Sequence, residues 1–189
     1  PDVAKSWEMS AGGSQCTFQL RKGMKWSDGE PHGADDYLFY MNDHLGNPDL
    51  APSTPSWLRP HGDLATLEKL DDYTIRFDFH GPYALFPLLA AGPNGLDMQR
   101  YCAHYLKAFH PKYTDQAKIQ KMAENAGFEQ WYQYYNDRRN LNTNPEYPTI
   151  NSWQIFQPPP KQPIVAVRNP YYWKVDTEGN QLPYIDRIE

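Results

Sequence analysis

Residues 18–45 constrain the fold of this chain most, because they specify a strand, a tight turn and a helix in close succession. Apolar and polar residues alternate over 17–20, so that Phe18 and Leu20 share one face of a half-covered strand. The run WSDGEP at 26–31 supplies turn-forming Asp, Gly and Pro residues, and a helix follows from Ala34. Apolar residues at helical spacing face inward from this helix, namely Leu38, Met41 and Leu45. We therefore expect a small sheet with a helix packed on it.

The rest of the chain is predicted to hold a second hairpin, then helices, then further strands. The first hairpin pairs strands at 4–10 and 16–20, and the second pairs strands at 65–70 and 73–79. Four prolines in 46–62 predict an irregular segment between the hairpins. Helices are expected within 83–91, where Pro87 interrupts the helix, and at 99–109, 115–126 and 128–137. A loop-rich, proline-rich stretch at 140–163 precedes strands at 164–168 and 181–189.

Charge and motif content argue against several classes of function. The net charge of −5 and the lack of a Lys/Arg cluster argue against a nucleic-acid partner, and no apolar run reaches the roughly 20 residues that span a bilayer. None of the six histidines forms a helical i, i+4 pair or joins a Cys-x-x-Cys cluster, so we expect no metal and no cofactor. There is no GxSxG elbow, and a helix start and a turn explain the acidic pairs at 35–36 and 71–72. We expect no catalytic residues, and hence no enzyme.

The two cysteines, Cys16 and Cys102, lie far apart in the sequence. Cys16 has the same strand parity as Phe18 and Leu20, which favours a buried free thiol. A single disulfide in an oxidising compartment is the alternative.

Four segments in order resemble the family 5 extracellular solute-binding proteins, the oligopeptide- and dipeptide-binding class that delivers ligands to ABC importers. The run RKGMKWSDGEPHGADD resembles that family's most typical motif. The other three segments are LEKLDDYTIRFDFHGPYALF, HYLKAFHPKY and RNPYYWKVDTEGNQLPYIDRI. One such motif would be weak evidence, but four in register, spread along nearly the whole chain, are strong evidence.

This resemblance implies a mixed α/β fold of the type II periplasmic-binding-protein kind, present only in part. Residues 1–87 would form the small peripheral lobe, which is rich in β-structure and carries the packed helix. Residues 88–189 would form an incomplete part of the larger, mixed α/β ligand-binding lobe. Since family members are much longer, we expect the chain to be a fragment of an exported protein that is periplasmic or extracellular.

The segment NPEYPTINSWQIF at 144–156 is the candidate binding site. The oligopeptide-binding branch of the family usually reads NP-x-GTGPY here, whereas this chain has Thr149, Asn151, Ser152 and Trp153 in place of the glycines. A Trp face can stack on a pyranose ring, and the Asn and Ser groups match hydroxyls. The following residues resemble an oligosaccharide-associated subset of the family. The alternative is that Trp153 anchors a proline-rich loop.

The sequence fits two functions. The first is the substrate-binding component of an ABC import system, which holds an oligopeptide or oligosaccharide between two lobes and contacts permease subunits. Its membrane contact would be made only through the permease or a lipid anchor outside this chain. The second is a stand-alone carbohydrate or cell-wall binding module that uses surface aromatics.

Overall fold

The computed structural model describes residues 2–189, which divide into two compact units. Unit 1 contains residues 2–22 and 33–101, and unit 2 contains residues 23–32 and 102–189. The sequence predicts lobes at 1–87 and 88–189. Pro1, the first residue of the first lobe, lies outside the described residues. That division stays a prediction.

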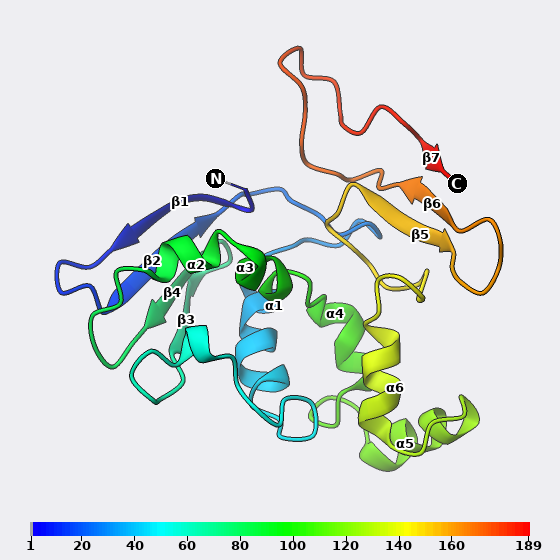
Figure 1. The fold of residues 1–189 in the computed structure, drawn as a ribbon, viewed down its shortest axis with the longest axis horizontal. Coiled ribbons are helices and arrows are strands. Elements are labelled where there is room, and N and C mark those ends of the chain that lie inside the picture. The colour runs from blue at the N-terminus through cyan, green and yellow to red at the C-terminus, as the bar shows by residue number, and fades with distance from the viewer. Residues whose placement is uncertain (1) are drawn as a thin grey trace. The chain divides into compact units, whose positions relative to one another are not determined.

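Unit 1 is built on a four-stranded antiparallel sheet (Figure 1). Its strands, in spatial order, are β1 (Ala4–Met9), β2 (Gln15–Leu20), β4 (Thr74–Asp78) and β3 (Thr66–Asp71). Both predicted hairpins are present, and the pairing of β2 with β4 joins them into one sheet. Phe18 lies opposite Ile75 and Cys16 opposite Phe77, so these side chains share one face.

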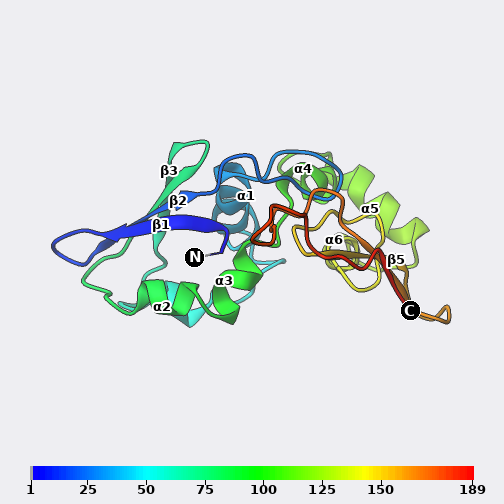
Figure 2. The ribbon, with the colours of Figure 1, turned by 90° about the horizontal axis from the view of Figure 1, so that it is seen from above.

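Aromatic side chains form much of the core of unit 1. Phe86, the first residue of α2 (Phe86–Ala90), packs with its ring centroid 4.9 Å from that of Phe77 and 5.9 Å from that of Phe18. The ring of Trp57 stacks on Phe86 at 5.6 Å and holds the irregular segment before β3. Figure 2 shows α2 followed by α3 (Pro93–Met98) along one side of the sheet. The predicted helix begins as α1 (Ala34–Leu38) and continues as a π-helical turn at Phe39–His44.

Two helix predictions are corrected, and one helix of the structure was not predicted. Pro87 lies in the first turn of α2 and does not interrupt it, because a helix needs no amide donor at that position. The helix expected at 99–109 begins later, as α4 (Ala103–Leu106) followed by a 3₁₀ turn at Lys107–Phe109. An extended Cys102, with ψ of 96°, separates it from α3, which was not predicted. α3 has the common start signal of Gly92 before Pro93.

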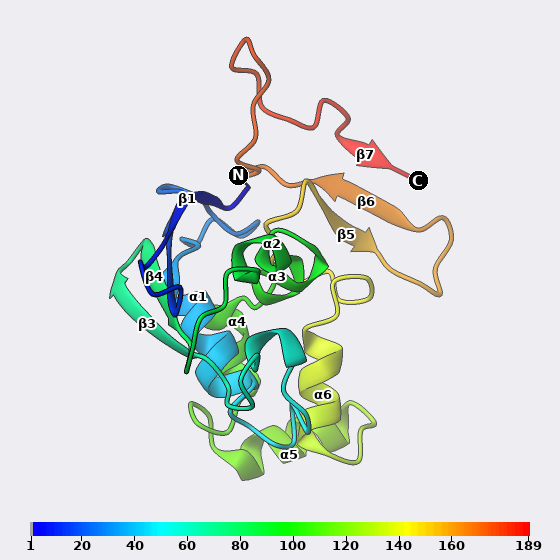
Figure 3. The ribbon, with the colours of Figure 1, turned by 60° about the vertical axis from the view of Figure 1, so that its left-hand side comes forward.

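Unit 2 contains a helix pair and a small sheet. α5 (Gln116–Asn125) begins where the Asp115 carboxylate accepts the Lys118 amide at 2.9 Å, and it ends before Gly127 with φ of +85°. α6 (Trp131–Arg138) follows. In the sheet, β6 (Val165–Arg168) lies between β5 (Trp153–Gln157) and β7 (Arg187–Ile188), as Figure 3 shows. β5 lies in the stretch predicted to be loop-rich, and β7 is shorter than predicted.

Both cysteines are free and buried, which confirms the expectation for Cys16. Burial raises the pKa of the Cys16 thiol to about 12, so it stays protonated at neutral pH. Among residues 2–189, no helix is long and apolar enough to cross a bilayer. Over the same residues, no cluster of three or more His, Cys, Asp or Glu side chains could hold a metal ion.

Candidate functional site

Three segments of unit 2 meet at Thr149, which lies in the candidate binding segment. The Thr149 carbonyl accepts the Ser27 amide at 2.9 Å, and the Thr149 amide donates to Ser27 Oγ at 3.0 Å. Asn169 Nδ2 donates to the same Thr149 carbonyl at 3.1 Å. Only 3% of Thr149 is exposed, and its Oγ1 accepts the Asn151 amide at 3.0 Å. Thr149 therefore supports the loop from within.

Asn169 holds residues 149–152, which we call the tip loop. Its Nδ2 donates to the Thr149 and Asn151 carbonyls, at 3.1 and 3.0 Å, and its main-chain amide donates to the Ser152 carbonyl at 2.9 Å. Its Oδ1 accepts the Tyr171 amide at 2.8 Å. The residue is 0% exposed, and its bond to the Thr149 carbonyl is buried, while those to Asn151 and Tyr171 are partly buried. One asparagine thus binds three carbonyl oxygens of the tip loop.

The tip loop presents its polar side chains differently from its backbone. Asn151 is exposed and Ser152 is half-buried, while the carbonyls of both residues are hydrogen-bonded to Asn169. The side-chain amide of Asn151 can both donate and accept hydrogen bonds, as a sugar hydroxyl or a peptide group requires.

Trp153 is the first residue of β5 and lies opposite Arg168 in the sheet. Its ring is half-buried, and its indole Nε1 donates to the Ile185 carbonyl at 3.4 Å. This bond ties the indole to the chain just before β7. The geometry fits the anchoring role, and ligand stacking by the ring stays a prediction.

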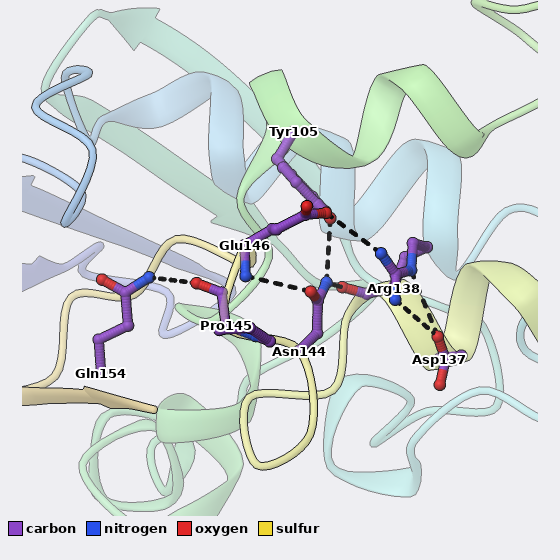
Figure 4. Close-up of polar contacts among 7 residues, drawn as sticks. All are labelled: Tyr105, Asp137, Arg138, Asn144, Pro145, Glu146 and Gln154. Atoms are coloured by element: carbon purple, nitrogen blue, oxygen red, sulfur yellow. Dashed lines mark hydrogen bonds and ion pairs between the residues drawn. The ribbon is translucent and has the colours of Figure 1, made fainter. Parts of the chain in front are cut away.

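A second buried asparagine supports the start of the segment (Figure 4). Asn144 Nδ2 donates to Tyr105 Oη at 2.9 Å and to the Arg138 carbonyl at 2.6 Å, while its Oδ1 accepts the Glu146 amide at 3.1 Å. Burial raises the pKa of the Tyr105 hydroxyl, and the hydrogen bond from Asn144 acts in the opposite direction. Gln154 Nε2 donates to the Pro145 carbonyl at 2.7 Å and connects β5 to this turn.

The candidate segment is almost free of charge. Glu146 is the only charged residue among residues 144–157. Its carboxylate pairs with the Arg138 guanidinium at 3.3 Å, and Arg138 also pairs with Asp137 at 3.0 Å. The tip loop itself therefore offers neutral hydrogen-bonding groups to a ligand.

The structure brings together a cysteine, a histidine and an aspartate that the sequence did not link. His104 Nε2 lies 2.7 Å from Asp28 Oδ2, and Cys102 Sγ lies 3.4 and 3.5 Å from the two ring nitrogens of His104. Because the sulfur is almost equally far from both nitrogens, it lies beside the ring and not in line with the lone pair of either nitrogen. Cys102 is also 0% exposed. The cluster therefore lacks the geometry and access of a nucleophilic thiol.

Sequence reasoning missed Ser27, Asn144 and Asn169 as supports of the segment. The two asparagines each precede a proline, in Asn144-Pro145 and Asn169-Pro170. Asn-Pro dipeptides favour turns in which the Asn side chain accepts the amide two residues later, as both do here. That signal could have located both turns, but not the carbonyls they bind.

The chain matches the family model "Bacterial extracellular solute-binding proteins, family 5 Middle" over residues 1–189. It is 34% identical to the periplasmic alpha-galactoside-binding protein of Rhizobium meliloti, over 100% of this chain and 25% of the relative. A solved structure of an oligopeptide-binding protein OppA is 45% identical, with a TM-score of 0.90 over 99% of this chain and 29% of that one. The periplasmic binding protein MelB of Agrobacterium fabrum C58, solved with stachyose, is 35% identical, with a TM-score of 0.72 over 99% and 26%.

These matches confirm the predicted mixed α/β fold of this class. The chain spans between 25% and 29% of the length of each of these three proteins. The family is one of binding proteins, in agreement with the expectation that the chain is not an enzyme. The chain therefore belongs to the bacterial extracellular solute-binding proteins of family 5.

Proposed function

We propose that the whole protein is the substrate-binding component of an ABC importer and captures an oligopeptide or an oligosaccharide. The match of the family model along the entire chain is the observation that carries this proposal. The similar proteins are named for both ligand classes, an alpha-galactoside and an oligopeptide. The protein would act in the periplasm or outside the cell and deliver its ligand to permease subunits. Its membrane contact would be made through the permease or a lipid anchor.

Within this function, the tip loop and Trp153 are the proposed ligand-binding residues of this chain. Asn151 and Ser152 would form hydrogen bonds with the ligand, because Asn151 is exposed and Ser152 is only half-buried. Trp153 would offer a ring edge or face beside them. Thr149 would contribute by supporting the loop, through the carbonyl and hydroxyl that hold it.

A thermal-shift experiment on the whole protein tests the proposal. Stachyose and a tripeptide such as trialanine are the probes, one for each ligand class. A ligand that binds only the folded state, present at about 100 times its Kd, should stabilise the protein by about 2.7 kcal/mol and raise its Tm. If neither these probes nor longer members of the two classes raise the Tm, the proposal is wrong.

An Asn151→Ala variant tests the residue assignment. We expect a weaker affinity, by about 1 kcal/mol for a lost hydrogen bond, with an unchanged Tm of the unliganded protein. Asn142→Ala is the matched control, because Asn142 is also exposed and lies in unit 2 outside the segment. Equal affinities of the two variants in calorimetric titration would remove Asn151 from the site.

The stand-alone carbohydrate-binding module is the second candidate, favoured only by the exposed aromatic residues of unit 2. Tyr171 and Tyr184 are 42% and 65% exposed. Such a module would bind insoluble polysaccharide and would not stimulate ATP hydrolysis by a reconstituted importer. The proposed transport function predicts the reverse on both counts.

A further inference from the structure

We propose that Asn169 is a positioning residue, which orients the tip loop so that Asn151 faces the ligand. The inference rests on the proposed function, in which the tip loop contacts the bound solute. Asn169 itself is buried and would not touch the ligand.

The hydrogen bonds of Asn169 leave the tip loop little freedom. Its two Nδ2 hydrogens and its main-chain amide bind the carbonyls of Thr149, Asn151 and Ser152, within a stretch of four residues. With these carbonyls directed toward Asn169, the Asn151 side chain projects to the solvent side. A carboxylate at position 169 would have no hydrogen to donate, and it would face two carbonyl oxygens.

Asn169 also fixes the segment that follows it. Its Oδ1 accepts the Tyr171 amide, and the Tyr171 ring lies over the turn at Gly29 with Lys25 Nζ 5.3 Å from the ring centroid. The turn at 26–29 also binds the tip loop, through the two hydrogen bonds between Ser27 and Thr149. The Asn169 side chain therefore contacts both the tip loop and the segment at 170–171.

Asn144 provides a matched control within the same unit. It is 2% exposed, and like Asn169 it precedes a proline, donates twice through Nδ2 and accepts the amide two residues later. Its donors bind Tyr105 and Arg138 and not the tip loop. The same substitution removes two Nδ2 donors at either position, and only those of Asn169 bind the tip loop.

The test compares Asn169→Asp with Asn144→Asp in the whole protein. Melting measures overall stability, hydrogen exchange with peptide-level resolution reports on residues 148–153, and titration with stachyose and trialanine measures affinity. We expect both variants to lower the Tm. Asn169→Asp should speed exchange in 148–153 and weaken binding of the probe that the wild type binds, each by about tenfold or more, and both effects should be clearly larger than those of Asn144→Asp.

Each outcome decides the proposal. Unchanged exchange in 148–153, or equal losses of affinity in the two variants, would overturn it. If the wild type binds neither these probes nor longer members of the two ligand classes, the proposed function fails, while the exchange measurement still decides whether Asn169 holds the loop. Should the Asp variants not fold, Asn169→Ser and Asn144→Ser remove the same Nδ2 donors and keep a short side-chain oxygen, which can accept the amide two residues later.

Discussion

At the scale of single residues, burial sets the protonation state of His32. Its imidazole is 0% exposed, and its ring centroid lies 5.3 Å from that of Trp26 in an edge-on arrangement. Burial penalises the charged form and lowers the pKa of His32 from 6.5 to about 4. The ring is therefore neutral in the folded protein at every pH above that value.

This shift predicts a loss of stability on acidification. The unfolded chain takes up a proton at His32 near pH 6.5, but the folded protein does so only near pH 4. Above about pH 6.5 His32 is neutral in both states and does not lower the unfolding free energy. As the pH falls toward 4, the unfolded state is increasingly favoured, because only it takes up the proton. Between about pH 7 and about pH 5, His32 should cost about 2 kcal/mol of unfolding free energy.

Urea denaturation at the two pH values measures this effect. His32→Gln should flatten the pH dependence, whatever its effect on stability at neutral pH. His80→Gln is the control, because it makes the same substitution at an exposed histidine. An unaltered pH dependence in His32→Gln would show that other groups cause it.

The candidate site could be located from the sequence only in part. Residues 149–153 stand where the family usually has glycines. Their Asn and Ser side chains indicate hydrogen bonding, and their Trp indicates stacking. The supports at Ser27 and Asn169 lie 122 and 20 residues from Thr149, and no local pattern relates them to it. An Asn-Pro pair in the sequence predicts a turn, but tertiary packing decides to which carbonyls the Asn side chain donates.

At the scale of elements, the hairpins of unit 1 could be predicted because their signals are local. Alternation and turn residues specify each hairpin, and the same alternation places Phe18, Ile75 and Phe77 on one face. β5 was missed because its partner β6 lies across a proline-rich loop, so that the pairing is not visible in the strand itself. The helix expected from residue 99 begins after Cys102, where the chain passes from unit 1 to unit 2.

A side chain at Gly29 should destabilise the turn at 26–29. Gly29 has φ of +93°, and a Cβ there would lie 3.1 Å from the Cζ and Oη atoms of Tyr171. Gly29→Ala should therefore cost about 1 kcal/mol for the left-handed backbone, plus a further cost for displacing the ring. The ring would also lose its contact with Lys25.

Gly23→Ala separates the two costs. Gly23 has φ of +80°, and a Cβ there would meet no atom within 4 Å, so that only the backbone cost applies. We expect Gly29→Ala to be the more destabilising in urea denaturation, and Tyr171→Ala to reduce the difference in a double-mutant cycle. Equal costs for the two glycine variants would mean that the Tyr171 ring moves away freely.

At the scale of the whole molecule, electrostatics can distinguish the two ligand classes. The chain carries a net charge of −5, yet the candidate segment holds a single charge, on Glu146, which is paired with Arg138. The exposed groups of the tip loop are neutral. Hydrogen bonds between neutral groups are little affected by salt, whereas pairs formed with the charged ends of a peptide are screened.

We therefore expect the affinity of the whole protein for a neutral oligosaccharide such as stachyose to be almost constant with salt. Calorimetric titrations at about 50 mM and about 500 mM NaCl span Debye lengths of roughly 14 to 4 Å and should give the same Kd within about twofold. A tripeptide bound through its charged ends should lose affinity over the same range. Since Asn151→Ala removes only a neutral contact, it should weaken sugar binding equally at both salt concentrations. A strongly salt-dependent Kd for stachyose would mean that charged groups outside this segment dominate its capture.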